Sequence, residues 1–284
     1  GKRFALGGAA DGPSYMFWNM DDTARSPFDR DPMTGFRCIK PKASDPREAQ
    51  LDRPIERKPA TDWASVEGFS DDAWKTWQNL LSYVKGPLAE KTEWTDETLP
   101  SWRMEKVTFN AAYPDERVIA YLFFPRNVPP PWQPVIYVHP GFGHAVSSSQ
   151  DGHNTLDLNF WDYLVKDGRV VVYPIFKGIF ERGGGPDNLG WWTWPNWSQS
   201  AKDIFRTIDY LETRQDIRVD HLGLLAISGG ADGGIVACSA DKRIKAAVLL
   251  GGGLYGIPST DREMMGLAKH ISMPVQMVNG RSDN

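Results

Sequence analysis

Apolar, strand-like runs alternate with helix-like segments along most of this chain, and that order constrains its fold more than any other feature. The strand-like runs are PVIYVHP (134–140), RVVVYPIF (169–176), HLGLLAIS (221–228), IKAAVLLGGG (244–253) and MPVQMVNG (273–280). Between them lie segments with apolar residues at helical spacing, such as LNFWDYLVKDG (158–168) and SAKDIFRTIDYLETR (200–214). Continuous β-branched runs joined by helices predict a parallel sheet covered on both faces. We therefore expect an α/β domain with a doubly wound, mostly parallel sheet.

Two elements precede this alternation, and a different composition precedes them. Residues 71–84 have helical spacing, and residues 104–125 have the pattern of two antiparallel strands around a turn at Tyr113-Pro114-Asp115. Residues 41–60 combine four prolines with dense charge, which is typical of an exposed linker. Residues 1–40 have neither helical nor strand periodicity. We expect a short N-terminal piece (1–40), a linker (41–60) and an α/β domain (61–284).

The strand-like run 221–228 ends in a serine that leads directly into a glycine-rich helix start. Leu224-Leu225-Ala226-Ile227-Ser228-Gly229-Gly230 has the pattern small-x-Ser-x-Gly, with Ala226 where glycine is commoner. A turn this tight requires small flanking residues, raises the serine hydroxyl above the sheet edge and directs N–H groups of the helix N-terminus at it. The pattern predicts a nucleophile elbow with Ser228 as the nucleophile. The alternative is a turn that only binds an anion or packs tightly.

A second alignment of the same pattern competes with this one. Gly229-Gly230-Ala231-Asp232-Gly233-Gly234 would place Ala231 in the nucleophile position and describe an inactive protein. That alignment makes Ser228, Gly229 and Gly230 extend the strand, where glycine loses backbone entropy and packs nothing. We therefore favour the alignment on Ser228.

A serine nucleophile needs N–H donors for the oxyanion, together with a base and an acid that orients the base. One donor is expected from the residue after the nucleophile, Gly229, and one from the loop His139-Pro140-Gly141-Phe142-Gly143-His144. We favour the amide of Phe142 as the second donor and Gly141 as the next choice. The alternative for this loop is an ordinary Gly/Pro turn at a strand end.

The acid and the base follow from the chain order serine, acid, histidine. Asp283 follows the last strand-like run and is the predicted acid. We expect Asp232 and Asp241, on the helix after Ser228, to face solvent or to cap that helix. All five histidines precede Asp283: His139, His144, His153, His221 and His270. Because the sequence also opens on Gly1 and ends soon after a strand-like run, we expect a piece of a longer chain, with the catalytic histidine beyond Asn284.

Three of these histidines suggest a metal site as an alternative. His139, His144 and His153 fall close together, and Asp151 or Asp157 would complete a zinc site, but their spacing matches no i, i+4 pair on a predicted helix. We expect neither a metal nor a cofactor.

The connection between residues 176 and 200 is long and rich in aromatic residues. Long loops at the carboxyl end of a sheet often carry function, so its tryptophans would form a wall or lid of the substrate pocket above Ser228. The alternative is a satellite cluster that packs under the loop. Glu181 and Arg182 are expected to pair and to hold the shape of this loop. The tryptophans are Trp191, Trp192, Trp194 and Trp197.

Composition excludes several classes of protein. The chain has 32 Lys and Arg against 36 Asp and Glu, without the basic surface expected of a nucleic-acid-binding protein. No apolar stretch is long enough to cross a bilayer, and the first residues lack the apolar core of a signal peptide. Cys38 and Cys238 form neither a CxxC pair nor a disulfide framework, as in a reducing compartment. We expect a soluble, cytoplasmic protein.

The serine turn, HPGFG, YPIFKGIFERGGG and VNGRSD together resemble the α/β-hydrolase superfamily, close to its dienelactone-hydrolase and acetyl-esterase-like branches, over residues 100–284. Residues 1–40 resemble the C-terminal end of a formylglycine-generating enzyme (sulfatase-modifying factor) domain, through PSYMFWN, SPFDRDP and Gly35-Phe36-Arg37-Cys38. The combination resembles bacterial multidomain proteins in which a serine/threonine kinase domain and a formylglycine-generating-like domain precede a hydrolase domain. The resemblance implies that the kinase domain and most of the formylglycine-generating-like domain lie upstream of Gly1, and that Cys38 has no catalytic role.

Two functions from different classes follow from these observations. The first is a serine hydrolase that acts on a small carboxylic ester through Ser228, Asp283 and a histidine beyond this sequence. The second is a non-catalytic binding or regulatory module of a signalling protein, favoured by Ala226 and by the absent histidine. Peptidases and thioesterases are the main remaining classes.

Overall fold

The computed structural model describes residues 3–4, 24–25, 62, 65–141, 148–149, 156, 158–183, 194–254 and 258–280. The chain divides into two units, Gly1–Ala60 and Thr61–Asn284. In the first unit, β1 (Arg3–Phe4) pairs antiparallel with β2 (Ala24–Arg25). Apart from these strands, the predicted N-terminal piece and linker lie outside the described residues, and their assignments stay predictions.

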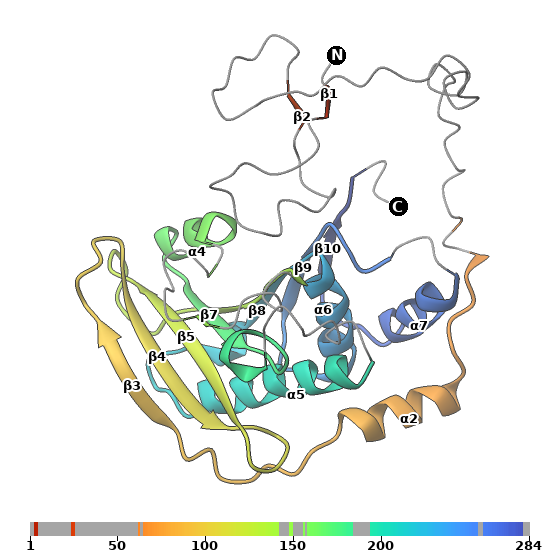
Figure 1. Cartoon of the computed structure of the whole chain (residues 1–284), viewed down its shortest axis with the longest axis horizontal. Coiled ribbons are helices and arrows are strands. Elements are labelled where there is room, and N and C mark those ends of the chain that lie inside the picture. The colour runs from red at the N-terminus through yellow and green to blue at the C-terminus, as the bar shows by residue number, and fades with distance from the viewer. Residues whose placement is uncertain are drawn as a thin grey trace, which may run out of the picture. The chain divides into compact units, whose positions relative to one another are not determined.

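Eight strands of the second unit form one sheet, in the order β10-β9-β8-β6-β7-β5-β4-β3 (Figure 1). Strands β10, β9, β8, β6 and β7 run parallel, whereas β5, β4 and β3 are antiparallel. The expectation of a doubly wound, mostly parallel sheet is therefore confirmed. The bounds are β3 Lys91–Asp96, β4 Trp102–Asn110, β5 Arg117–Pro125, β6 Pro134–Val138, β7 Val170–Ile175, β8 Gly223–Ile227, β9 Ala246–Leu250 and β10 Val275–Val278.

The antiparallel part is built on the predicted hairpin. β4 and β5 pair continuously from Trp102 opposite Pro125 to Asn110 opposite Arg117. The turn between them includes the predicted residues 113–115, and Asp115 has a φ of 60°, a conformation that Asp adopts more readily than most residues. Strand β3, which the sequence analysis did not predict, forms the exposed edge of the sheet beside β4.

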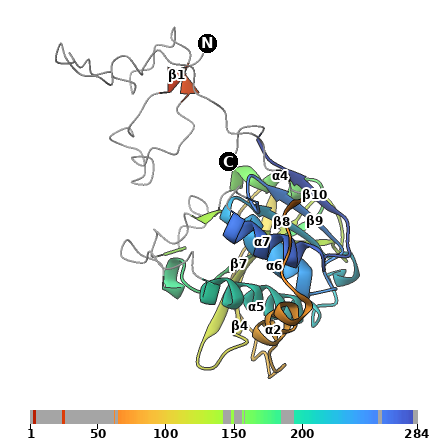
Figure 2. The ribbon, with the colours of Figure 1, turned by 90° about the vertical axis from the view of Figure 1, so that its right-hand side faces the viewer.

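Five helices accompany the sheet in the described residues: α2 (Asp71–Leu81), α4 (Asp162–Lys166), α5 (Trp194–Leu211), α6 (Gly229–Ala240) and α7 (Pro258–Ala268). The crossovers β6-α4-β7 and β7-α5-β8 step in opposite directions along the sheet. Since such crossovers are right-handed, α4 and α5 cover opposite faces. Helices α2, α5, α6 and α7 pack in succession on one face (Figure 2).

The central strands are buried on both faces, as the continuous apolar runs predict. Every residue of β6 and β7 is buried, and Trp161, at the start of α4, is fully enclosed beside Phe123. In the part of the chain that the structure describes, no helix is both long and apolar enough to span a bilayer.

Candidate active site

The sheet brings two loops together where its strand order reverses. β6 lies between β7 and β8, so the chain leaves β6 towards one side and returns to its other side. In open α/β sheets, ligands bind outside the carboxyl ends of the strands at such a point. The residues that follow β6 and β8 there are His139 and Ser228, and Val138 pairs with Ala226 just before them. Two of the predicted site segments therefore meet at one edge of the sheet.

Ser228 occupies a strained turn between β8 and α6. Its φ is 55° and its ψ is −129°, outside the regions that residues other than glycine usually adopt. The Ser228 N–H donates to the Leu250 carbonyl at 2.7 Å, and the Ser228 carbonyl accepts from the Ala231 N–H at 2.8 Å. These bonds to β9 and to the first turn of α6 hold the strained backbone. The sequence pattern therefore predicted the strand, turn and helix correctly.

Small residues allow this turn to form. A β-carbon on Gly230 would lie 2.4 Å from the Val138 carbonyl oxygen, so α6 could not approach β6 with any larger residue there. A β-carbon on Gly234 would lie 3.1 Å from the Ala226 β-carbon. The absent side chain at Gly234 explains why alanine fits at position 226, where the pattern more often has glycine.

The competing alignment is wrong, because Ala231 lies fully buried within α6 and not at the turn. Of the two residues expected to face solvent or to cap α6, Asp241 does cap it, whereas the expectation is wrong for Asp232. Asp232 is fully buried in the first turn of α6, which is apolar on all sides and packs inside the domain. Asp241 is the C-cap residue of α6, but its carboxylate is largely buried and binds Arg243 at 2.6 Å.

Two of the three predicted oxyanion donors, Gly229 and Gly141, lie within the described residues. Gly229 is the first residue of α6, beside the turn, where a helix N-terminus favours negative charge. Gly141 follows His139 and Pro140 at the end of β6, so it lies on the same edge of the sheet. Phe142, the favoured second donor, lies outside the described residues.

Asp283 lies outside the described residues too, but the strand that leads to it does not. β8, β9 and β10 are parallel and in register, with Ile227 beside Leu250 and Leu250 beside Val278. Beyond them, the Asn279 amide exchanges hydrogen bonds with the backbone of Gly252 at 3.4 Å. A β-carbon on Gly252 would lie 2.3 Å from the Ser228 carbonyl oxygen. Asn279, which stands four positions before Asp283 in the chain, is thus connected to the backbone of Ser228 through Gly252.

Two of the three described histidines stack on aromatic side chains, and the third lies at the far end of the sheet. His139 is buried, its ring stacks on Tyr173 with centroids 5.6 Å apart, and its Nδ1 lies 2.7 Å from the Pro140 carbonyl oxygen. His221 precedes β8, at the end of the sheet opposite Ser228. His270 stacks on Trp74 of α2 at 3.9 Å. His144 and His153 lie outside the described residues, together with Asp151 and Asp157 of the zinc alternative; within the described ranges, no metal-ligand cluster occurs.

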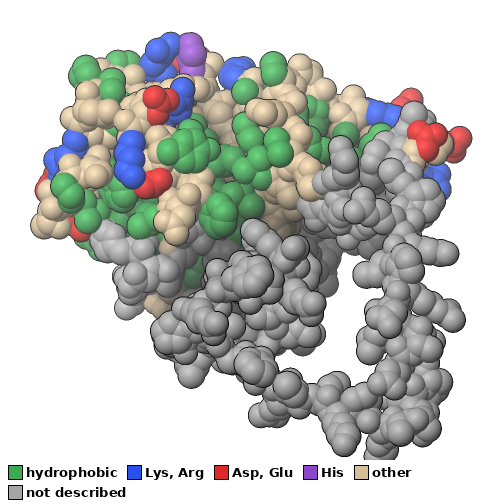
Figure 3. All heavy atoms as spheres, turned by 90° about the horizontal axis from the view of Figure 1, so that it is seen from above, with side chains coloured by type: hydrophobic (Ala, Val, Ile, Leu, Met, Phe, Trp, Pro, Cys, Tyr) green, Lys and Arg blue, Asp and Glu red, His purple; other side chains and the backbone are tan. Residues whose placement is uncertain are grey.

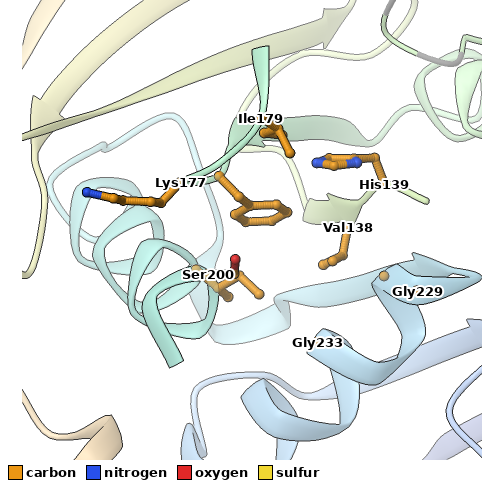
Figure 4. Close-up of a pocket in the computed structure, with 10 residues that line it drawn as sticks. Val138, His139, Lys177, Ile179, Ser200, Gly229 and Gly233 are labelled. Atoms are coloured by element: carbon orange, nitrogen blue, oxygen red, sulfur yellow. The ribbon is translucent and has the colours of Figure 1, made fainter. Parts of the chain in front are cut away.

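A small cavity adjoins the turn between α5, α6 and the ends of β6 and β7 (Figure 4). Its volume is about 40 Å³. Most of its walls are apolar, the Ser200 hydroxyl points towards it, and the Lys177 ammonium group points away (Figure 4). It is lined by Val138, His139, Phe176, Lys177, Ile179, Ser200, Ile204, Gly229, Gly230 and Gly233. Seen from above, apolar side chains gather in the middle of the coloured surface (Figure 3).

Similarity to solved structures identifies this architecture. An acetyl xylan esterase from Paenibacillus sp. R4 matches with 14% identity over 84% of this chain and 93% of that chain, at a TM-score of 0.53. Acetyl xylan esterase 1 from Thermoanaerobacterium sp. JW/SL YS485 matches with 12% identity over 78% and 83%, at 0.55. A glucuronoyl esterase from Solibacter usitatus matches with 14% identity over 80% and 82%, at 0.52. The chain has the α/β-hydrolase fold. No protein-family model and no curated protein matches its sequence.

Within this hydrolase fold, the connection after β7 differs from the prediction. Residues 194–200, predicted as loop, form the first turns of α5. Pro195 is compatible with that assignment, because N–H groups in the first turn of a helix have no partner within the helix, so proline, which has no N–H, costs no hydrogen bond there. The predicted lid residues Trp191 and Trp192 lie outside the described residues, as does the side chain of Trp194 at the first position of α5, so the lid stays a prediction.

Glu181 and Arg182 hold this loop of the hydrolase fold, but each through a different neighbour. The Arg182 guanidinium donates to the buried Asp203 carboxylate of α5 at 2.5 Å and to the Ile175 carbonyl at 2.8 Å. Glu181 accepts from Ser149. The sequence analysis expected a pair between the two and missed Asp203 and Ser149, which lie 21 and 32 positions away from their partners.

Proposed function

We propose that this protein is a serine hydrolase that cleaves a small carboxylic ester with Ser228 as nucleophile. The observation that carries the proposal is the strained backbone of Ser228, with a φ of 55°, between a buried strand and a helix N-terminus. Strain of this kind costs on the order of 1–3 kcal/mol and is typical of functional sites. A turn that only had to pack could use glycine there without that cost.

The reaction proceeds in two steps. The Ser228 Oγ attacks the ester carbonyl carbon while its proton passes to the histidine base, and the carbonyl oxygen becomes an oxyanion. The N–H groups of Gly229 and Phe142, with Gly141 as the next choice for the second donor, stabilise that charge. The histidine then protonates the leaving alcohol as the carbon–oxygen bond breaks. Water, deprotonated by the same histidine, then attacks the acyl carbon; the bond from that carbon to the Ser228 Oγ breaks, the acid is released, and the histidine returns its proton to the Oγ.

We propose Asp283 as the acid that orients this histidine, in the chain order serine, acid, histidine. The alignment of Ser228, Gly252 and Asn279 along one edge supports the place of the acid. The cavity beside Gly229 supports a small acyl group, since its 40 Å³ is well below the roughly 150 Å³ that holds a benzene ring. The names of the similar structures, acetyl xylan esterases and a glucuronoyl esterase, support an ester substrate.

The second candidate is a non-catalytic binding or regulatory module. The observation that favours it is that the described histidines have other contacts or places: His139, at the same sheet edge as Ser228, stacks on Tyr173, whereas His221 and His270 precede β8 and β10 at the other end of the sheet. The resemblance of residues 1–40 also leads us to propose upstream kinase and formylglycine-generating-like domains in the same chain, in a cytoplasmic protein.

A fluorophosphonate probe distinguishes the two candidates. It reacts covalently with an activated serine, so we expect the full-length protein to be labelled and its Ser228→Ala variant to remain unlabelled. Labelling of the 284-residue chain alone is expected to be much slower, because an unassisted serine is a weak nucleophile. A full-length protein that folds but is not labelled would favour the binding module.

A further inference from the structure

The small cavity beside Gly229 has two walls that come from different parts of the chain. One wall is the loop 176–183, which follows β7, and the other is α5 (Figure 4). The wall residues are Phe176, Lys177 and Ile179 in the loop, and Ser200 and Ile204 in α5. The width of the cavity therefore depends on how far the loop stands from α5.

The carboxylate of Asp203 joins these two walls. Asp203 lies on α5 next to Ile204 and is fully buried. Its Oδ2 accepts a hydrogen bond from the Lys177 N–H at 3.0 Å, among the loop residues that line the cavity. The same oxygen accepts from the Arg182 guanidinium, near the end of the loop, at 2.5 Å. One side chain therefore fixes the loop to α5 at two points.

The turn between β4 and β5 completes this network. The Tyr113 hydroxyl donates to Asp203 Oδ1 at 2.9 Å and accepts from the Arg182 guanidinium at 2.6 Å. Burial and the charge of Asp203 raise the pKa of Tyr113, so the hydroxyl keeps the proton that it donates. In the same turn, Glu116 pairs with the Lys177 ammonium group. Both oxygens of the buried carboxylate thus have donors, as a buried charge requires.

The loop depends on these bonds for its form. Its one regular element is the 3₁₀ turn η5 (Phe180–Arg182), and Phe180 has a φ of 45°, a strain that persists only when the surroundings fix it. The Arg182 side chain is almost fully buried, so without the carboxylate its charge would lie unpaired away from water. Loss of Asp203 should therefore let the loop move away from α5 and widen the cavity.

We propose that Asp203 is a positioning residue that sets the width of this cavity and, with it, the length of the acyl chain that the protein accepts. The inference rests on the proposed function, because it takes the cavity as the site of the acyl group. Asp203 does not itself line the cavity and acts through the loop. A wider cavity admits a longer chain, whereas an acetyl group already fits. Loss of Asp203 should therefore change selectivity between acyl chains.

The test compares Asp203→Asn with the parent full-length protein, with p-nitrophenyl acetate and butyrate as substrates. Asparagine keeps the size of the side chain, but it has no charge and places an NH₂ group where a carboxylate oxygen accepts. The measured quantity is kcat/KM for butyrate divided by kcat/KM for acetate. We expect this ratio to rise about 10-fold, the lower end of what one methylene group is worth in an apolar pocket.

Asp209→Asn is the matched control for lost stability. Asp209 lies on the same helix, is nearly as deeply buried, and pairs with Arg206 at 2.9 Å and Arg243 at 2.7 Å. It is not among the residues that line the cavity. Each variant removes the charge from a buried ion pair, so both should lower the melting temperature. Only Asp203→Asn should change the ratio.

Tyr113→Phe tests the same network with a milder change, in case Asp203→Asn does not fold. It keeps the aromatic ring and removes only the hydroxyl that bonds Asp203 and Arg182. We expect the ratio to rise, by less than in Asp203→Asn. Tyr83→Phe is its control, because the Tyr83 hydroxyl donates to Asp209 at 2.9 Å and should not affect the ratio.

Three outcomes would overturn the inference. An unchanged or lower ratio in Asp203→Asn, or in Tyr113→Phe if Asp203→Asn does not fold, would refute it while the proposed function stands. An equal rise in Asp209→Asn or Tyr83→Phe would show that the change follows from lost stability and not from the loop. A parent protein that hydrolyses neither ester and does not react with a fluorophosphonate would refute both the proposed function and this role.

Discussion

Gly252, at the end of β9, lies so close to Ser228 that a β-carbon there would be 2.3 Å from the Ser228 carbonyl oxygen and 2.8 Å from its carbonyl carbon. Contacts this short do not occur, so the two backbones must separate if any side chain is introduced. The same residue exchanges hydrogen bonds with Asn279. Gly252 thus fixes the distance between the nucleophile turn and the strand that leads to the predicted acid.

Gly252→Ala is expected to displace the Ser228 turn. Overpacking of a rigid site costs about 1–3 kcal/mol of stability, and the reactivity of the serine should fall with it. Urea unfolding and the rate of fluorophosphonate labelling measure the two effects. Gly223→Ala, at the other end of β8, is the control, because a β-carbon there would meet only ordinary contacts, the nearest at 3.5 Å. Equal labelling rates in both variants would contradict the proposed role of the close approach.

Ser228→Ala is expected to abolish turnover without unfolding the full-length protein. Loss of the nucleophile costs on the order of 10⁶-fold in one well-studied serine protease, whereas alanine accepts the same backbone at no greater cost than serine. Hydrolysis of p-nitrophenyl acetate and thermal unfolding, measured on the same preparation, check both statements. An unchanged rate would refute the assignment of Ser228.

The features that the sequence predicts correctly are those fixed by local chemistry. The Ser228 turn needs small residues next to it in the chain, and the hairpin 104–125 carries its turn signal at Tyr113-Pro114-Asp115. Both therefore leave a pattern in a few consecutive residues. The same is true of the buried strands β6 and β7, whose continuous apolar runs require cover on both faces.

Features set by distant neighbours leave no such pattern. β3 is an exposed edge strand, so its sequence KTEWTD lacks the apolar runs of the inner strands. Residues 194–200 are helical despite a composition typical of a loop. Asp232 is buried because the surroundings of α6 enclose it, although a charged residue in a first turn usually faces solvent. The contact between Glu181 and Ser149 joins residues 32 positions apart.

Two substitutions in the cavity beside Gly229 are expected to change acyl-chain selectivity in opposite directions. A β-carbon on Gly233 would lie 3.9 Å from Val138 Cγ1, so Gly233→Ala fits and fills part of the 40 Å³. It should stabilise α6 by up to about 1 kcal/mol and favour acetyl over butyryl esters more strongly. Ile204→Ala enlarges the cavity, costs about 2–5 kcal/mol of stability and should favour butyryl esters.

The ratio of kcat/KM for p-nitrophenyl acetate and butyrate measures this selectivity. One methylene group in an apolar pocket is worth about 10- to 200-fold in such a ratio. If neither substitution changes the ratio, the cavity does not receive the acyl chain, whatever the absolute rates are.

Asp209, on α5, is expected to make the free energy of unfolding fall at acidic pH. Burial alone would raise its pKa, but bonds from Arg243, Lys85, Arg206 and Tyr83 outweigh burial and lower it. A lowered pKa in the folded state means that this stabilisation is present above the pKa of about 3.9 in the unfolded chain. It is lost as pH falls through the lower pKa of the folded state. Asp209→Asn should cost about 3–5 kcal/mol at pH 7, because it breaks a buried ion pair.

Urea unfolding at pH 7 and at pH 3 tests this expectation. The difference between Asp209→Asn and the parent protein should be smaller at pH 3 than at pH 7. Asp72→Asn, on the exposed side of α2, is the control, since its ion pair with Lys75 is solvent-exposed and worth little. An equal deficit at both pH values would mean that Asp209 acts by packing and not through its charge.

Asp283→Asn is expected to lower kcat about 10⁴-fold in the full-length protein near neutral pH. The acid of such a triad holds the histidine in the tautomer that can accept the serine proton, and an amide holds the wrong one, with a loss of about this size. The strand before Asp283 ends at the same sheet edge as Ser228, since Val278 pairs with Leu250 and Leu250 with Ile227. Steady-state kinetics measure this loss. The control is Asp220→Asn, because Asp220 precedes β8 at the end of the sheet opposite Ser228. An Asp283→Asn variant with full activity would show that another residue orients the base, and a matching loss in Asp220→Asn would show that the effect does not depend on position.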